Sequence, residues 1–146
     1  AYFSQPAHRE NELETKTYQS WIIQIIEDTV YAFNQEFNKL WNTERKGILY
    51  PKSLFEDQGQ SSEHGLKSVL KDIWKDAVSV CGIEMHRRCL SLAHNADFES
   101  IEDISLRATL EARNLLMGRE LILNSDSIES VGELSSIAVK FNEKAV

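Results

Sequence analysis

Cysteine and proline are scarce in this sequence, whose 146 residues contain two of each. The cysteines, Cys81 and Cys89, lie eight positions apart, and the spacing of the apolar residues around them predicts that they share one helix. Two side chains at that separation on a helix do not form an easy disulfide, and two lone thiols do not supply a metal site. We therefore expect reduced, structural thiols, as is usual in a cytoplasmic protein.

Blocks of basic residues are also absent. Lysine and arginine number 16 against 23 acidic residues, which leaves a net charge of −7. Nucleic acids and anionic membranes attract proteins with an excess of positive charge, so neither is an expected partner. No apolar run approaches the ~20 residues that span a bilayer, and the candidate at 21–26 is interrupted by Gln24. The first residues lack the basic and apolar regions of a secretory signal, which favours a cytoplasmic location.

The groups that hold a nucleotide in kinases are missing as well. The sequence has no glycine-rich phosphate loop, no Gly-x-x-x-x-Gly-Lys-Ser/Thr motif and no pair of aspartates placed to hold magnesium ions. His64-Gly65 is followed by Leu66, where a kinase-like catalytic loop needs an aspartate. Phosphoryl transfer depends on positioning and charge neutralisation by such groups. We therefore expect no catalytic residue, no bound nucleotide and no metal site in this chain.

What the sequence does contain is helical periodicity. Apolar residues recur at three- and four-residue steps in these stretches: 18–41, 66–78, 83–93, 106–121 and 128–141. No useful stretch alternates with period two, so we predict an all-α fold of five or six helices in a single domain, 1–146. Trp21, Trp41 and Trp74 fall on apolar stripes and are expected in the core. The first helix carries several aromatics and is expected to be covered by several partners.

Glycine, proline and capping residues predict where these helices end. Gly47 and Pro51 stop the first helix and open a mobile loop, about 47–65, with one turn near 53–56. Gly82 is expected to break or kink the helix that precedes it. Side-chain oxygens that could cap the later helices are those of Asp103 or Ser105, and of Ser125 or Ser127 before the last helix.

The stretch Met85–His94 carries two consecutive arginines, Arg87 and Arg88, inside an apolar pattern. Guanidinium groups are always charged and hold five donors in a fixed fork, which suits sugar hydroxyls, carboxylates and phosphates. Two interpretations stay open on the pattern alone: surface cations that pair with local acids such as Glu84, or a site for an anion or polyol. Adjacent residues of a helix point ~100° apart, so both reach one ligand only at a bend or a helix end.

Polar residues next to the arginines are expected to have structural roles. His94 is expected to close the helix and hydrogen-bond the backbone or Asp97, rather than act as a base. A metal site at His94, Asp97 and Asp103 is not expected, because a second histidine and close spacing are missing. Asp97 and Ser100 can cap a short helical turn.

The same region resembles a known family. Between Cys81 and Asp103 the sequence contains, in order, Arg-Arg, Ala-His and Asp-Phe-Glu-Ser-Ile. This series resembles the C-terminal part of S-methyl-5-thioribose kinases. The likeness covers about the whole chain except 52–65, and its further segments are 107–118, 18–41 and Tyr2-Phe3. Two positions depart from the family pattern, Ser91 where glycine is frequent and His86 where an aliphatic residue is usual.

The resemblance implies a fold and an activity for the protein. The fold would be the C-terminal helical subdomain of a protein-kinase-like (aminoglycoside phosphotransferase-like) enzyme, here without its nucleotide-binding lobe. That enzyme transfers the γ-phosphate of ATP to the 1-hydroxyl of S-methyl-5-thioribose in methionine salvage, with ATP and Mg²⁺ as cofactors. Arg87 and Arg88 would bind the sugar. The chain begins with Ala1 rather than methionine, and we expect it to start inside a longer protein.

Further expectations follow for the isolated chain and its partners. Alone it would be inactive, because its partner in catalysis is the missing N-terminal part of the same kinase. The small-molecule substrate and a second copy, in a homo-oligomer, are the other expected partners. The alternative function is a non-catalytic, all-helical interaction module, which any acidic helical domain of this size could be.

Overall fold

The computed structural model of the chain describes residues 12–90 and 96–143. These residues form five α-helices and two short 3-10 helices, and they contain no strand. The elements are α1 Glu12–Thr43, η2 Lys52–Leu54, η3 Glu56–Gln58, α2 Glu63–Leu90, α3 Ala96–Glu99, α4 Ile104–Leu123 and α5 Val131–Glu143. The predicted all-α class is therefore confirmed. Tyr2, Phe3 and His94, which carry part of the resemblance, lie outside the described residues.

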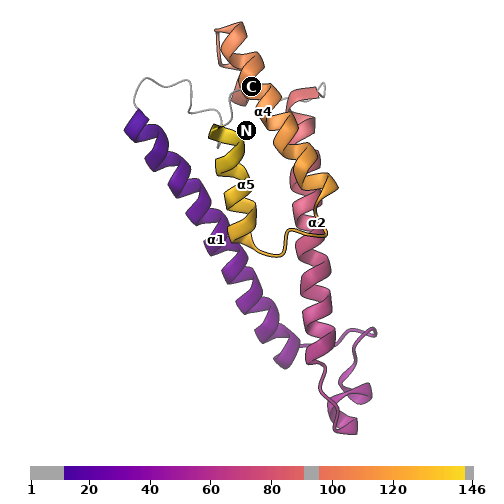
Figure 1. The fold of residues 1–146 in the computed structure, drawn as a ribbon. Coiled ribbons are helices and arrows are strands. Elements are labelled where there is room, and N and C mark those ends of the chain that lie inside the picture. Colours follow the sequence, from indigo (N-terminus) through magenta and orange to yellow (C-terminus); the bar gives the residue numbers. More distant parts are fainter. Residues whose placement is uncertain (1–11, 91–95, 144–146) are drawn as a thin grey trace.

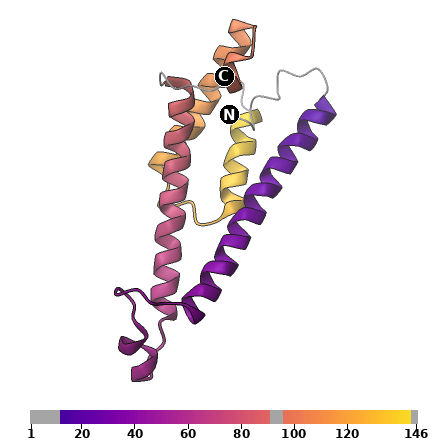
Figure 2. The ribbon, with the colours of Figure 1, turned by 180° about the vertical axis from the view of Figure 1, so that it is seen from behind.

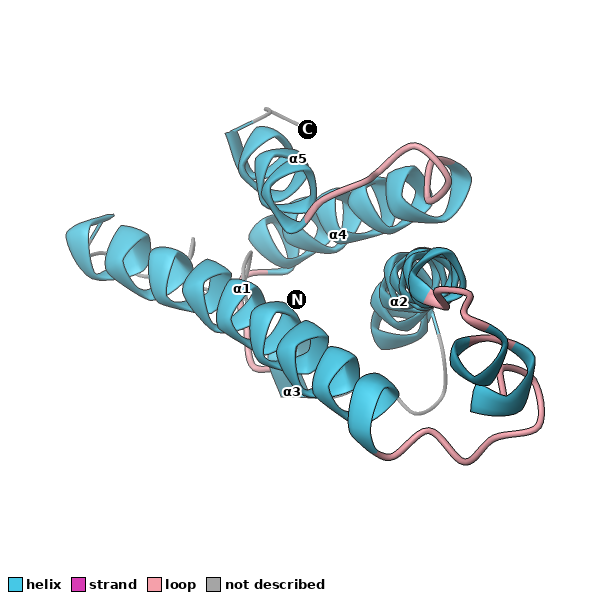
Figure 3. Cartoon of the chain, turned by 90° about the horizontal axis from the view of Figure 1, so that it is seen from below, coloured by secondary structure: helices cyan, strands magenta, loops and turns pink. Residues whose placement is uncertain are grey.

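The two longest helices form a V. α1 and α2 approach each other where the chain passes from one to the other, and they diverge toward the start of α1, as opposite views show (Figure 1 and Figure 2). α5 lies beside α1 and α4 and contacts both. α4 packs along α2 in the most extensive helix pairing of the described chain. Seen from below, α2 is viewed nearly end-on, and α1 and α4 lie on different sides of it (Figure 3).

α1 is less buried than its sequence predicts. Trp21 is 54% exposed and Phe33 is 44% exposed. The predictions that Trp21 belongs to the core and that several partners cover this helix are therefore wrong, because α1 diverges from α2 (Figure 1). Trp41, near the C-terminal end of α1, is only 8% exposed, as predicted. Trp74 is half-buried, and its indole N–H donates to the carbonyl of Ile128 at 2.7 Å.

Arg45 makes several contacts that stabilise the connection between α1 and α2. Its guanidinium donates to the hydroxyl of Ser62 and to the carboxylate of Glu56, and it lies 4.9 Å from the ring centroid of Trp41. The hydrogen bond from Arg45, helped by that from Ser62, lowers the pKa of Glu56 from 4.5 to about 2. The turn predicted near 53–56 is confirmed as η2 and η3. The mobility expected for 47–65 stays a prediction.

α2 is one continuous helix of 28 residues, so the break predicted at Gly82 is wrong. The reason lies in its partner helix. A Cβ at Gly82 would come within 2.5 Å of the carbonyl oxygen of Gly118 in α4, and a Cβ at Gly118 would come within 2.9 Å of the carbonyl oxygen of Gly82. The two glycines therefore let the backbones of α2 and α4 touch. This close packing offsets the ~1 kcal/mol by which glycine weakens a helix relative to alanine.

The later helices begin at capping residues, one predicted and one missed. The Asp103 carboxylate accepts from the backbone N–H groups of Ser105 at 2.9 Å and Leu106 at 3.0 Å, which confirms the predicted cap of α4.

The cap predicted for the last helix at Ser125 or Ser127 is wrong, because α5 begins later, at Val131. There the Ser130 hydroxyl accepts from the N–H of Glu133 at 3.2 Å, and the Glu133 carboxylate accepts from the N–H of Glu129 at 2.7 Å.

The buried apolar side chains fall into two clusters. The larger cluster joins α2, α4 and the start of the segment before α5, and consists of Val78, Met85, Met117, Leu121 and Ile128. The smaller cluster holds α3 against α4 and consists of Phe98, Ile101 and Leu110, with Cys89 and Leu106 packed beside it. The second cluster therefore fixes α3 beside the C-terminal end of α2, where the arginines lie. Among the described residues, no helix is long and apolar enough to span a bilayer.

Candidate functional site

The arginine pair occupies the last turn of α2, which ends at Leu90. Because α2 is not broken at Gly82, the helix end is the place where both arginines can approach one ligand. Their directions differ by ~100°, as expected for neighbours on a helix. Accordingly, Arg87 pairs with a carboxylate of its own helix and Arg88 pairs with one from α3. The structure thus places the two predicted residues side by side but gives them different surroundings.

Arg87 forms a local ion pair with Glu84. Its Nε donates to the two carboxylate oxygens at 3.0 and 2.9 Å, and its Nη2 donates to one of them at 2.7 Å. The guanidinium lowers the pKa of Glu84, and the carboxylate raises the pKa of Arg87. The side chains remain 39% and 47% exposed. Pairing with Glu84 was one of the two interpretations that the sequence left open, and it is present. In water such a pair contributes little to stability.

Arg88 forms a more buried ion pair. Its Nη1 donates to the Oδ2 atom of Asp97, and the two side chains are 24% and 5% exposed, respectively. Asp97 lies on α3 directly before Phe98, which is 2% exposed. An ionised carboxylate in such surroundings needs a charged or hydrogen-bonding partner. The sequence singled out Asp97 only as a capping residue or a partner of His94, and its pairing with Arg88 was missed.

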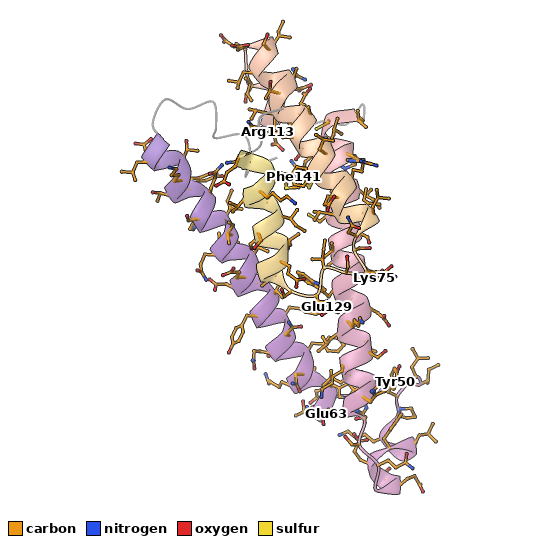
Figure 4. The ribbon with its side chains drawn as sticks, viewed as in Figure 1. Tyr50, Glu63, Lys75, Arg113, Glu129 and Phe141 are labelled. Atoms are coloured by element: carbon orange, nitrogen blue, oxygen red, sulfur yellow. The ribbon has the colours of Figure 1, made fainter. Side chains whose placement is uncertain are left out.

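α4 supports the end of α2 beneath the arginines. The Asn114 side chain, which is fully buried, donates to the carbonyl of Met85 at 2.7 Å and to the Sγ atom of Cys89 at 3.3 Å. One residue further along each helix, the Nε2 atom of His86 lies 2.8 Å from the carbonyl oxygen of Leu115. Figure 4 labels Arg113, the residue before Asn114, on α4. These contacts flank Arg87 and Arg88 in the sequence and hold their backbone in place.

Cys89 is partly buried, as expected of a structural thiol, whereas Cys81 is exposed. Cys81 and Cys89 both lie on α2, and they do not form a disulfide. Burial raises the pKa of Cys89, which keeps the thiol protonated near neutral pH. The role of Cys89 in this site is therefore packing and acceptance of a hydrogen bond from Asn114.

Two hollows of the described chain lie away from the arginines. One, of about 950 Å³, lies between α1, α2 and the segment before α5, and two of its lining residues, Lys75 and Glu129, are labelled in Figure 4. The other, of about 690 Å³, is lined by Trp41, Glu56 and Ser62 among others. Neither is lined by Arg87 or Arg88.

The chain is similar to named enzymes. No family model matches it. It is 31% identical over 131 residues to "Methylthioribose kinase" of Escherichia coli O45:K1, covering 90% of this chain and 31% of that protein. It is 33% identical over 139 residues to "Methylthioribose kinase 1" of Oryza sativa subsp. japonica, covering 92% and 31%, respectively. A Yersinia enterocolitica "Methylthioribose kinase" is 35% identical over 104 residues, covering 68% and 25%. The chain spans about a third of the length of the first two relatives.

Proposed function

Because the chain resembles methylthioribose kinases of bacteria and plants over 90% to 92% of its length, we propose that it is the C-terminal helical part of such a kinase. The complete enzyme transfers the γ-phosphate of ATP to the 1-hydroxyl of S-methyl-5-thioribose. In this proposal Arg87 and Arg88 bind the sugar. The missing N-terminal part of the same polypeptide supplies the catalytic residues.

The similarity in sequence carries the assignment to a kinase, and the placement of the arginine pair supports its role in sugar binding. Arg87 and Arg88 are neighbours in the last turn of α2, on a backbone held by α4 and beside α3, which packs on α4. A sugar offers hydroxyl oxygens as acceptors, and its phosphorylated product adds an anion that guanidinium groups also bind. The pair of Arg87 with Glu84 is exposed to water. A ligand can therefore replace some of these contacts at little cost.

The carboxylates of the described residues do not form a group suited to the metal ion of a kinase. No group of three His, Cys, Asp or Glu side chains in the described residues is arranged to hold a metal ion. The carboxylates nearest the arginines, Glu84 and Asp97, are engaged in ion pairs. In our proposal, ATP and Mg²⁺ are bound by the upstream part of the enzyme, and this chain alone is inactive. Its own contribution is to bind and orient the sugar.

Two measurements test this function. The complete polypeptide that contains this chain should release ADP from ATP and Mg²⁺ only when S-methyl-5-thioribose is added. Calorimetric titration of this chain alone with ATP and Mg²⁺ should show no saturable heat. Absence of sugar-dependent ADP release would refute the proposed kinase activity. Micromolar binding of ATP to the isolated chain would refute the proposal that the upstream part of the enzyme binds the nucleotide.

A second candidate function is a non-catalytic interaction module. The exposed apolar face of α1 favours it, since Trp21, Ile25, Ile26 and Phe33 are each at least 38% exposed. Such a face serves a partner protein or a second copy of the chain, and the latter agrees with the homo-oligomer that we propose for the kinase. The ADP assay separates the two functions, because an interaction module releases no ADP when the sugar is added.

A further inference from the structure

We propose that Asp97 is a positioning residue, which holds Arg88 in the orientation that contacts the sugar. This inference rests on the function proposed above and adds a residue that does not itself touch the substrate. Its basis is the difference between the partners of the two arginines. Glu84 belongs to the same helix as Arg87 and is exposed, whereas Asp97 belongs to another helix and is buried.

The position of Asp97 is fixed by its neighbours in the sequence. Phe98 and Ile101 are 2% and 5% exposed, and both pack against Leu110 of α4, which is fully buried. α3 is only four residues long, so these apolar contacts, rather than helix length, determine where it lies. With its own side chain 5% exposed, Asp97 presents its carboxylate from a rigid, packed position.

A fixed carboxylate orients a guanidinium group more strictly than it orients an ammonium group. The guanidinium is planar and its five donors form one rigid fork. When Nη1 is held by the Oδ2 atom of Asp97, the directions of the remaining donors are restricted as well. The Arg88 side chain keeps 24% of its surface exposed, so part of it remains within reach of a ligand. Such preorganisation lowers the entropy that binding costs.

Glu84 cannot serve Arg87 in the same way. Its carboxylate lies three residues back on the same helix and is 47% exposed, so water competes for the contact between the two side chains. We infer that Arg88 is the fixed contact of the sugar site and that Arg87 is the adaptable one. Loss of Asp97 should therefore weaken sugar binding, whereas loss of Glu84 should affect it little.

The experiment uses the complete kinase and compares three isosteric variants. Asp97→Asn removes the charge that holds Arg88, Glu84→Gln removes the charge next to Arg87, and Glu111→Gln is the matched control. Glu111 accepts from Arg107 at 2.8 Å in another partly exposed ion pair, which lies within α4 and includes neither arginine of the site. We expect the KM for methylthioribose to rise about ten-fold in Asp97→Asn, with the KM for ATP unchanged. The other two variants should change the KM for the sugar less than about two-fold.

A double variant shows whether Asp97 acts through Arg88. If it does, Asp97→Asn should have little further effect on the KM for the sugar once Arg88 is replaced by Lys, because coupled residues are not additive. A merely structural role would lower the melting temperature and leave both KM values unchanged, and this result would overturn the proposal. Should Asp97→Asn fail to fold, Asp97→Glu keeps the charge but displaces the carboxylate, and an unchanged KM for the sugar would then overturn it.

The outcomes also separate this inference from the function on which it rests. If Arg88→Lys raises the KM for methylthioribose while Asp97→Asn does not, Asp97 is not a positioning residue and the kinase assignment stands. If the unmodified enzyme shows no sugar-dependent release of ADP, the proposed function itself is refuted. Equal effects of Glu84→Gln and Asp97→Asn would contradict the distinction between the fixed and the adaptable arginine.

Discussion

Replacement of Gly82 by alanine should destabilise the protein, although alanine is the better helix former. A Cβ at this position would lie 2.5 Å from the carbonyl oxygen of Gly118 and 2.8 Å from Cγ1 of Ile122. The oxygen belongs to the backbone of α4 and cannot rotate away, so α2 and α4 must separate. Their separation would loosen the larger core cluster, which includes Met85 and Met117.

The magnitude follows from two opposing effects. Overpacking of a core costs about 1–3 kcal/mol, and a clash with backbone lies at the upper end of this range. Alanine returns ~1 kcal/mol through its higher helix propensity. The net loss in the free energy of unfolding is therefore about 2 kcal/mol, which for a chain of this size lowers the melting temperature by about 4–8 °C.

Gly132→Ala is the matched control, because Gly132 also lies in a helix, α5, but the nearest atom to its Cβ would be 3.9 Å away. This variant should be as stable as the unmodified protein or slightly more stable. Chemical denaturation followed by far-UV circular dichroism measures both changes. If Gly82→Ala is as stable as Gly132→Ala, the close approach of α2 and α4 is not present in solution.

Three further predictions concern the site, the connection after α1 and the exposed helix face. Arg87→Lys in the complete kinase should lower kcat/KM for methylthioribose roughly ten- to hundred-fold through loss of the guanidinium fork, with ATP affinity and melting temperature unchanged. The control is Arg119→Lys, on the exposed side of α4. Equal kinetics of the two variants would exclude Arg87 from the site. Because the folded-state pKa of Glu56 is lowered from 4.5 to about 2, its ion pair with Arg45 stabilises the fold above pH 4.5 and is lost as pH falls toward 2. The stability difference between the unmodified protein and Glu56→Gln should shrink over that interval in acid titrations, and a constant difference would contradict the lowered pKa. Trp21→Glu should reduce self-association of the chain in sedimentation, because Trp21 is 54% exposed on the apolar face of α1; an unchanged distribution of species would place the contact elsewhere.

Features that depend on neighbours a few residues apart could be read from the sequence. Helical periodicity located the helices, because side chains three and four residues apart share one face of a helix. Asp103 was predicted as a cap because its contacts with Ser105 and Leu106 are local. The pair of Arg87 with Glu84 was anticipated for the same reason. The hypothesis that the two arginines bind a sugar came from the resemblance of the sequence to methylthioribose kinases rather than from the spacing of the arginines.

Features that depend on distant segments were decided by the tertiary structure alone. Gly82 looked like a break, but Gly118 of α4 makes it a point of close helix packing. Trp21 looked like a core residue, but the divergence of α1 from α2 leaves it exposed (Figure 1). Asp97 became the partner of Arg88 only because α3 packs on α4. Periodicity tells which face of a helix is apolar, whereas the packing of the whole chain determines what, if anything, covers that face.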